Sequence, residues 1–449
     1  MGIDLTLSRI LKLLPTSTFT WRALHVAGTN GKGSVCAYLS SALSSSGIRT
    51  GRFTSPHLMD RWDSIVLNEK IVDSTLFHET EALVKKRNQD GNIGATEFEV
   101  LTATAFEIFS KEKVELAVVE VGLGGRLDAT NTIKDPVVTV LTKIGMDHTD
   151  FLGDTIEKIA REKAGIMKPG APCVVDASNA ESALQVIRQV KEEVGAGEVI
   201  LAAPENDADP NTTVATTTNE SGTTTTTAAP AAGTLPSLVT IRTPAFGVQS
   251  YTPSLLGKYQ HYNLACAINA LSVAARSYPQ ITAETVKNGV SQAKNPGRLQ
   301  WITVKSSIGK KQEMIIDGAH NPEAAGALAT FVDENLRMRI KQQNVTWVVG
   351  ISHGKDAKSI LGEFLKEGDV VSTVEFGPVD GMPWVKPTES SELAKEAEML
   401  VGPKGLVRSW GADLKGAVQW SCEVGCEGPI VIAGSLYLAG DVTRLSKIL

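Results

Sequence analysis

Cysteine is scarce in this chain of 449 residues, and long apolar runs are missing. The five cysteines are widely scattered: Cys36, Cys173, Cys266, Cys422 and Cys426. Cysteines that are so few, and odd in number, exclude a disulfide-rich scaffold and favour reduced thiols in a reducing compartment. Cys422 and Cys426 stand close together, but no second pair of Cys or His residues accompanies them, so we expect no zinc site.

A membrane-directing segment is also absent from the sequence. No apolar stretch approaches the ~20 residues of a membrane span, and no basic segment precedes an apolar core at the start. Met1-Gly2 with Thr6 fits the loose pattern for myristoylation, but the leucines that follow suit the apolar face of a docked helix better. We expect a cytoplasmic protein with no membrane partner, and the sequence leaves a mitochondrial pool open.

Basic residues are not in excess, because 44 Lys and Arg residues stand against 50 Asp and Glu residues, a net charge of −6. Such a chain lacks the positive charge typical of nucleic-acid-binding proteins, so we expect no nucleic-acid partner. Binding of a small anionic ligand is still possible, since backbone N–H groups can hold one whatever the net charge. The apolar fraction of 42% is that of an ordinary globular protein. We expect a monomer.

Continuous apolar strands separated by helical periodicity predict an α/β fold. Unbroken apolar strands of this kind belong to parallel sheets that are buried on both faces. The chain is expected to form a domain with a mostly parallel sheet over 1–294 and a smaller Rossmann-like α/β domain over 297–449. The strands are expected at 22–27, 116–121 and 136–141 and, in a second α/β pattern that begins near Arg298, at 314–316, 346–349, 370–373 and 430–433.

The segment from Ala203 to Gly233 differs in composition from the rest of the chain. It is dominated by Thr, Ala, Asn and Pro, and it contains no aromatic residue. Such a segment cannot bury enough apolar area to offset the entropy lost on ordering. We therefore expect a disordered surface insertion within the first domain.

The strongest chemical signal follows the first predicted strand, where a glycine-rich turn leads directly into a helix. Several backbone N–H groups and the positive end of the helix dipole converge there. A lysine in this turn would reach terminal phosphates, and a serine hydroxyl could ligate Mg²⁺. The first domain is therefore expected to be of the P-loop ATPase type, although Val26 occupies the first glycine position of the general motif. The residues expected to bind the phosphates are Gly28, Thr29, Asn30, Gly31, Lys32, Gly33 and Ser34.

A guanine-reading motif is missing from the sequence. The nearest candidate is Thr142-Lys143-Ile144-Gly145, in which glycine stands where aspartate would be needed. ATP is therefore favoured over GTP. A regulatory switch that binds nucleotide without ligating anything is an alternative, but the missing guanine reader and the metal-type residues described next disfavour it.

Two polar residues are expected at the same sheet edge as the phosphate loop. Glu120 interrupts an apolar strand, where a lone carboxylate is costly unless it is paired or bound to a metal. His148 follows the next strand, and ligand sites of open parallel sheets lie at this edge. Both are candidates for an Mg²⁺–phosphate site, with a salt bridge and a structural histidine as the alternatives. Composition alone marks Lys163, on a helix predicted over 155–167, as a solvent-exposed lysine.

Several segments taken together resemble one family, that of folylpolyglutamate synthases and dihydrofolate synthases. This family belongs to the Mur-ligase-like, ATP-dependent amide-forming ligases, and the resemblance covers 7–442 apart from the insertion. The matching segments are Ala27–Ser34, Ser55-Pro56-His57-Leu58, Val119–Asn131, Asp147-His148, Glu162–Ile166 and Asp317-Gly318-Ala319-His320-Asn321. Those most like fungal dihydrofolate synthetases are Ser8-Arg9-Ile10, His353-Gly354-Lys355, Gly381-Met382-Pro383-Trp384 and Gly434–Leu438.

The resemblance implies a role for each matching residue. Asn263, Arg298 and Asp317 would join the phosphate loop in binding ATP. Two Mg²⁺ ions would be held by Ser34, Ser55, Glu120 and His148. Lys163 would be carried as a carbamate, which reverses its interpretation from composition. The catalytic residues would be Lys32, Glu120, His148 and Lys163, and the substrate would be held by Thr96, Phe98, Leu127, Asp128, Ala129 and His320.

The implied reaction joins dihydropteroate to L-glutamate and converts ATP to ADP and phosphate. A free carboxylate is a poor acyl donor, so the γ-phosphoryl group would first activate it as an acyl phosphate. Extension of tetrahydrofolate by γ-linked glutamates uses the same chemistry and stays open as an alternative. A catalytically inactive interaction protein is a third possibility, which the retained Lys32, Glu120, His148 and Lys163 disfavour.

Overall fold

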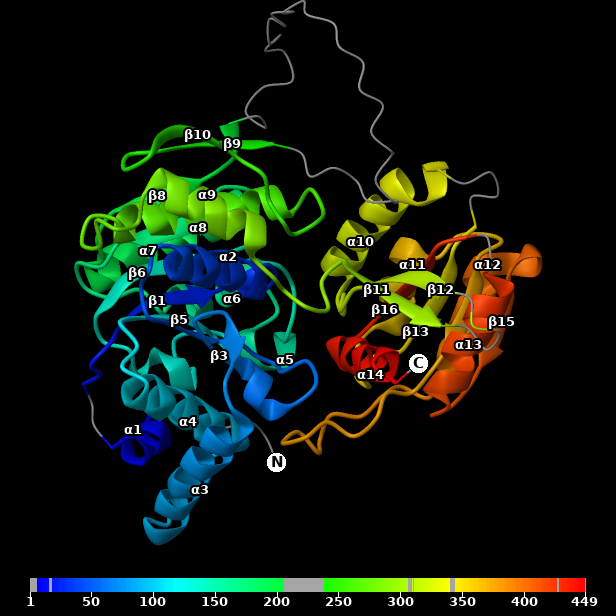
Figure 1. Cartoon of the computed structure of the whole chain (residues 1–449), viewed down its shortest axis with the longest axis horizontal. Coiled ribbons are helices and arrows are strands. Elements are labelled where there is room, and N and C mark those ends of the chain that lie inside the picture. Colours follow the sequence, from blue (N-terminus) through cyan, green and yellow to red (C-terminus); the bar gives the residue numbers. More distant parts are fainter. Residues whose placement is uncertain are drawn as a thin grey trace, which may run out of the picture.

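The computed structural model describes residues 6–15, 18–205, 238–305, 309, 311–339, 344–425 and 428–448. Two helix-flanked sheets lie side by side, the N-terminal part to the left and the C-terminal part to the right (Figure 1). Most of the segment expected to be a disordered insertion, residues 206–233, lies outside the described residues, as does Cys426. None of the helices in the described ranges combines the length and the apolar character that crossing a bilayer requires.

The N-terminal part is built on an eight-stranded sheet of order β4-β3-β2-β5-β1-β6-β7-β8. At its centre β1 (Arg22–Ala27) pairs with β5 (Leu116–Glu120) and β6 (Pro136–Leu141). The three strands and their parallel arrangement were predicted, and their order was not. The antiparallel edge β2-β3-β4 was not predicted. The other elements of this part are α1 (Ser8–Leu13), α2 (Lys32–Ser45), β2 (Thr50–Phe53), η1 (Arg61–Ser64), β3 (Ile65–Leu67), β4 (Lys70–Ile71), α3 (Ser74–Asp90), α4 (Glu97–Lys111), η2 (Ala129–Thr132), α5 (Thr149–Leu152), α6 (Ile156–Ala164), β7 (Cys173–Asp176), α7 (Glu181–Val194), β8 (Val199–Ala202), β9 (Val239–Thr243), β10 (Gly247–Tyr251), α8 (Gln260–Ala274) and α9 (Ala283–Gln292).

The C-terminal part is built on a six-stranded sheet of order β11-β12-β16-β13-β14-β15. Its strands pair in parallel except for β11, which forms an antiparallel edge with β12. Its elements are β11 (Gln300–Lys305), β12 (Lys311–Ile316), α10 (Pro322–Asn335), η4 (Arg337–Arg339), β13 (Thr346–Val349), α11 (Ala357–Phe364), β14 (Val370–Thr373), α12 (Ser390–Val401), η5 (Gly402–Lys404), β15 (Leu406–Ser409), α13 (Leu414–Val424), β16 (Ile430–Ala433) and α14 (Leu436–Ser446).

Helices cover both faces of the larger sheet, which explains why apolar residues on its central strands point to both faces. Successive residues of a strand point to opposite faces. Leu24 and Val26 of β1 pack on one face against α2 and α8, and Ala23 packs on the other face with α4. With both faces buried, β1 needs no alternation of polar and apolar residues.

Candidate active site

The carboxyl ends of β5, β1 and β6 lie side by side, because these three strands are parallel neighbours. β1 leads through residues 28–31 into α2, β5 ends at Glu120, and β6 is followed by Asp147 and His148. Three polar segments that are distant in sequence therefore meet at one edge of the sheet. Open parallel sheets bind their ligands at this edge.

Glycine is required at two positions of the loop between β1 and α2. Gly31 is the N-cap residue of α2 and has a φ of 91°, a left-handed conformation that strains other residues. At Gly28 a Cβ atom would lie 1.8 Å from Oγ1 of Thr142. The loop is also fixed to the end of β6, because the N–H of Thr29 donates to the carbonyl of Lys143 at 2.8 Å. The first N–H groups of a helix have no partner within it, so this fixed turn suits an anion.

Lys32 and Glu120 form an ion pair beside this turn. Nζ of Lys32 lies 3.9 Å from Oε1 of Glu120, and both side chains are largely buried. Oε2 of Glu120 lies 3.7 Å from where a Cβ atom of Gly33 would stand, so it faces the start of α2. Burial raises the pKa of Glu120 to about 7, although Lys32 and the backbone N–H of Ser55 act in the opposite direction. Desolvation thus disfavours the carboxylate, and an added cation would stabilise it.

Ser34 is held by two side chains to which the sequence assigned no role. Its buried hydroxyl oxygen accepts hydrogen bonds from Nε2 of Gln260 and from Nδ2 of Asn295, both at 3.1 Å. Because both amides donate, the hydroxyl hydrogen of Ser34 can point to a ligand. No local pattern in the sequence signals the contact of Asn295 with a residue so far away in the chain.

Lys163 is buried, with 5% of its surface exposed. The prediction from composition that this lysine is solvent-exposed is therefore wrong. The cause is tertiary, because α6 turns this side chain toward the phosphate loop, where Nζ donates to the carbonyl of Gly28 at 2.8 Å. Burial, together with the charge of Lys32, lowers the pKa of Lys163 to about 7. A large share of this amine is therefore uncharged near neutral pH. The helix itself is shorter than predicted and ends at Ala164.

His148 lies at the rim of the site, and its side chain is 47% exposed. Its φ of 53° places it in the left-handed region at the start of α5. Nε2 of His148 lies 3.9 Å from Oδ2 of Asp147, whose side chain is only 9% exposed. The sequence had placed Asp147 in a matching motif without a role of its own.

Residues at the start of the C-terminal part face this edge. The carboxylate of Asp317 accepts from the backbone N–H of Leu299 at 2.9 Å and lies 3.9 Å from the guanidinium of Arg298. Nε2 of His320 lies 3.8 Å from Oδ2 of Asp147 in the N-terminal part. The nucleotide residues predicted in two distant segments are thus brought to one place.

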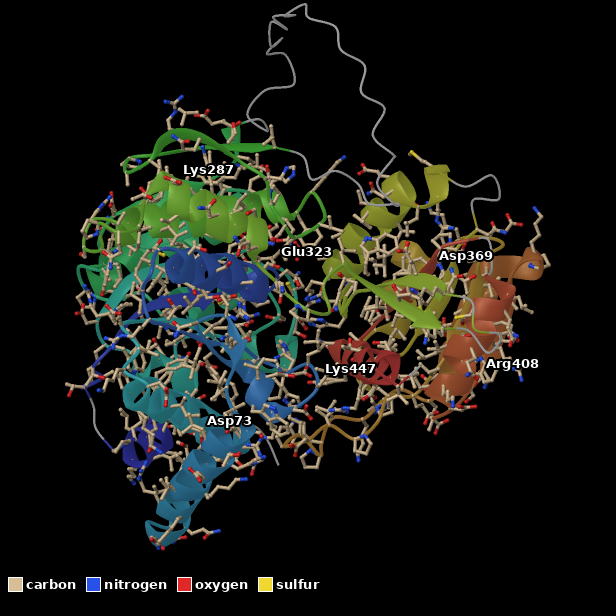
Figure 2. The ribbon with its side chains drawn as sticks, in the orientation of Figure 1. Asp73, Lys287, Glu323, Asp369, Arg408 and Lys447 are labelled. Carbon is tan, nitrogen blue, oxygen red and sulfur yellow. The ribbon has the colours of Figure 1, made fainter. Side chains whose placement is uncertain are left out.

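A cavity of about 570 Å³ lies between the two parts. Figure 2 shows Glu323, one of its wall residues, on the side of the C-terminal part that faces the N-terminal part. The predicted site residues in its wall are Gly28, Thr29, Asn30, Gly31, Lys32, Gly33, Ser34, Ser55, Glu120, His148, Lys163, Asn263, Arg298, Asp317 and His320. The structure thus brings together all the residues predicted to bind ATP and metal.

The other predicted substrate residues stand apart from the described wall of this cavity. Phe98 lies immediately behind it, since a Cβ atom on the wall residue Gly122 would lie 2.3 Å from Cζ of Phe98. The five residues that do not contribute to the described wall are Thr96, Phe98, Leu127, Asp128 and Ala129. Their contact with a substrate stays a prediction.

Two of these residues form hydrogen bonds that stabilise the backbone of their own segments. The hydroxyl of Thr96 caps α4 by accepting from the N–H of Glu99 at 3.2 Å. The buried carboxylate of Asp128 accepts from the N–H of Leu123 at 2.9 Å and from the hydroxyl of Thr130 at 2.5 Å. These bonds shape the segments on which a substrate would lie.

Both parts of the chain match known protein families. Residues 26–271 match the Mur ligase middle domain, and residues 300–445 match the C-terminal domain of dihydrofolate synthetase. The chain is 37% identical to the probable dihydrofolate synthetase of Schizosaccharomyces pombe, in an alignment covering 100% of both chains. The chain belongs to the dihydrofolate synthetase/folylpolyglutamate synthase family.

Other members of the dihydrofolate synthetase/folylpolyglutamate synthase family agree in sequence and in fold. The dihydrofolate synthetase of Saccharomyces cerevisiae is 34% identical, with 99% of this chain and 98% of that protein covered. The structure of the Mycobacterium tuberculosis folylpolyglutamate synthase complexed with ADP superposes with a TM-score of 0.78 at 26% identity, covering 99% and 95% of the two chains. These findings confirm the family resemblance, the fold class and the enzyme class predicted from the sequence, an ATP-dependent ligase of folate metabolism.

Proposed function

We propose that this family member is a dihydrofolate synthetase, which joins L-glutamate to 7,8-dihydropteroate and converts ATP to ADP and phosphate. The observation that carries the ligase chemistry is the single cavity in which Lys32, Glu120 and Lys163 face residues of the C-terminal part. The choice of acid is supported by full-length similarity to two fungal dihydrofolate synthetases. ATP as co-substrate is supported by the complex of the M. tuberculosis relative with ADP.

The phosphate loop would bind the triphosphate of ATP. Backbone N–H groups at the start of α2 donate to the phosphate oxygens, and Lys32 neutralises the terminal phosphate as its charge shifts during transfer. The hydroxyl hydrogen of Ser34, whose oxygen is occupied by two amides, donates in the same direction. Asn263, which lies against Gly31 of this loop, would contact the nucleotide from the N-terminal part, and Arg298 and Asp317 would contact it from the C-terminal part.

The residues of the cavity fit Mg²⁺. Among the described residues no three His, Cys, Asp or Glu side chains converge, and Mg²⁺ usually shares its ligands between one or two carboxylates and the substrate phosphates. Glu120 supplies a buried carboxylate that a cation would stabilise. Ser34 would supply its hydroxyl oxygen in exchange for one of the two amide hydrogen bonds that this oxygen accepts. Ser55 and His148 complete the set proposed for two ions. When bound, Mg²⁺ neutralises phosphate charge and orients the carboxylate that is to be phosphorylated.

Lys163 is proposed to be carried as a carbamate. An uncharged amine adds to CO₂ with loss of a proton, and the lowered pKa of Lys163 supplies that form near neutral pH. The modification would exchange the hydrogen bond with the carbonyl of Gly28 for an anionic group near Lys32. Such an anion complements the cations that gather around the phosphates.

The protein contributes to amide formation mainly by holding the reacting groups in position. The carboxylate of dihydropteroate attacks the γ-phosphorus and releases ADP, and the amine of glutamate then attacks the acyl carbon and releases phosphate. Holding the acid and the amine together supplies much of the rate, and a closed cavity keeps water from the acyl phosphate. His320, in the same wall as Arg298, is proposed to contact the substrate.

Extension of tetrahydrofolate by γ-linked glutamate is the second candidate. It is favoured by the fold similarity to the folylpolyglutamate synthase of M. tuberculosis. Both reactions use the same activation of a carboxylate, so the phosphate site alone does not separate them.

One assay tests both candidates. Purified protein receives MgATP, L-glutamate and either dihydropteroate or tetrahydrofolate, and phosphate release is followed. We expect release with dihydropteroate to exceed that with tetrahydrofolate by about tenfold or more, a discrimination within the range that pocket contacts provide. Lys32→Ala should abolish release with both acids. Faster release with tetrahydrofolate would favour the second candidate, and release with neither acid would refute the ligase proposal.

A further inference from the structure

The two parts of the molecule meet through a cluster of polar side chains, of which Asp147, Asn321 and Lys355 have no role in the reaction above. Asp147, in the loop after β6, lies at the centre of this cluster. Its Oδ1 accepts from Nζ of Lys355 at 2.6 Å, and its Oδ2 accepts from Nδ2 of Asn321 at 3.3 Å. Nε2 of His320 lies 3.8 Å from Oδ2. Three side chains of the C-terminal part therefore converge on one carboxylate of the N-terminal part.

Asn321 extends this cluster to the phosphate loop. Its Nδ2 also donates to Oδ1 of Asn30 at 3.2 Å, and its Oδ1 accepts from the N–H of Ala324 at the start of α10. Asn30 in turn donates to Oε2 of Glu323 at 2.8 Å. Asn321 is only 4% exposed, and a buried amide needs partners. Its donors find them in the N-terminal part, so the docked arrangement is the one that satisfies this residue.

The ion pair of Asp147 and Lys355 is partly shielded from water. The two side chains are 9% and 26% exposed, so their attraction is screened less than that of a surface pair. Lys355 is also close to the reaction site, since its charge acts on His148 together with the charges of Lys32 and Lys163. The pair therefore stands at the edge of the cavity and connects its two walls.

We propose that Lys355 is a positioning residue for the ligase reaction: through Asp147 it docks the C-terminal part on the phosphate-loop edge and keeps water from the acyl phosphate. The inference rests on the proposed function. Water that reaches the acyl phosphate cleaves it to the starting acid and phosphate, so ATP is consumed and no amide forms. Loss of the docking contact should therefore appear as ATP hydrolysis without amide formation.

Three full-length variants test this role. In wild-type protein we expect about one ADP for each amide bond, and in Lys355→Ala about two or more, because an open site hydrolyses its intermediate. Lys355→Arg keeps a cation for Asp147 and should restore the wild-type ratio. Lys358→Ala, which removes a nearby exposed lysine on α11, is the matched control and should leave the ratio unchanged.

A second measurement follows docking without any reaction. Backbone hydrogen exchange in 143–149 and 321–326, measured without nucleotide, should be faster in Lys355→Ala than in wild type and Lys358→Ala. An unchanged ADP-to-amide ratio in Lys355→Ala overturns the proposal, and unchanged exchange overturns the docking contact. If wild-type protein forms no ADP in response to the pterin acid, the proposed function fails, while the exchange comparison still decides whether Lys355 docks the two parts.

Discussion

Glu120 is proposed to serve the chemistry at the expense of stability. A carboxylate at the end of a buried strand loses its hydration, which raises its pKa to about 7. Its partner Lys32, at 3.9 Å, compensates only in part. A charge kept in such a place is expected where a cation binds during function.

Glu120→Gln keeps the shape of the side chain and removes its charge. We expect ADP formation in the presence of the pterin acid and glutamate to fall by about 100-fold or more, because charge stabilisation of the phosphoryl group is lost. The melting temperature at pH 8 should equal or exceed that of wild type, because a desolvated charge is gone. Glu193→Gln, at a surface pair with Arg161, is the control. Wild-type activity in Glu120→Gln would contradict the role of Glu120.

Lys163 gives a pH-dependent prediction of definite sign. Its pKa is about 7 in the folded chain against an ordinary value of 10.5. Between these values the unfolded chain binds a proton at Lys163 that the folded chain does not, so stability rises with pH. In bicarbonate-free buffer, wild type should gain stability relative to Lys163→Met from pH 7 to 9, as measured by urea denaturation. A constant difference would show that the amine is not desolvated as described.

At the scale of elements, the phosphate loop depends on how closely α2 and α9 pack. A Cβ atom on Gly289 would lie 2.4 Å from Cα of Ala42 and 2.6 Å from its nitrogen. The hydroxyl of Ser41 also donates to the carbonyl of Gly289 at 2.8 Å. Backbone atoms cannot yield as a flexible side chain can, so glycine lets α9 support the helix that begins at the phosphate loop.

Gly289→Ala should therefore destabilise the protein by about 1–3 kcal/mol, the usual cost of overpacking. Gly362→Ala is the matched control, because Gly362 also lies within a helix and a Cβ atom there meets nothing within 4 Å. That control should be neutral or stabilising, since alanine has the higher helix propensity. Urea unfolding of both variants measures the difference, and equal stabilities would contradict the close packing of α2 and α9.

At the scale of the whole molecule, the two parts touch at several places besides the cluster around Asp147. The loop 377–388 runs from the C-terminal part toward the N-terminal part (Figure 1), and Gly381 packs against the guanidinium of Arg61. Arg444 of α14 donates to the carbonyl of Met59 at 2.7 Å. Because several contacts hold the two parts together, Lys355→Ala should loosen the cavity without separating the parts. We therefore expect this variant to stay folded and to consume more ATP for each amide bond formed. The domain boundary between 294 and 297 stays a proposal.

The local elements of the site follow from the amino-acid sequence alone. A glycine-rich turn between an apolar strand and a helix specifies a phosphate loop because glycine permits Gly31 its left-handed φ, and unbroken apolar strands specify a parallel sheet that gathers Glu120 and His148 at one edge. The packing of distant segments buries Lys163 against Gly28 and places Gln260 and Asn295 against the hydroxyl of Ser34. It also paired Asp147 with Lys355, 208 residues further along the chain. The reason is physical: strand and turn patterns depend on near neighbours, whereas burial and pairing depend on which surfaces the packing of two sheets brings into contact.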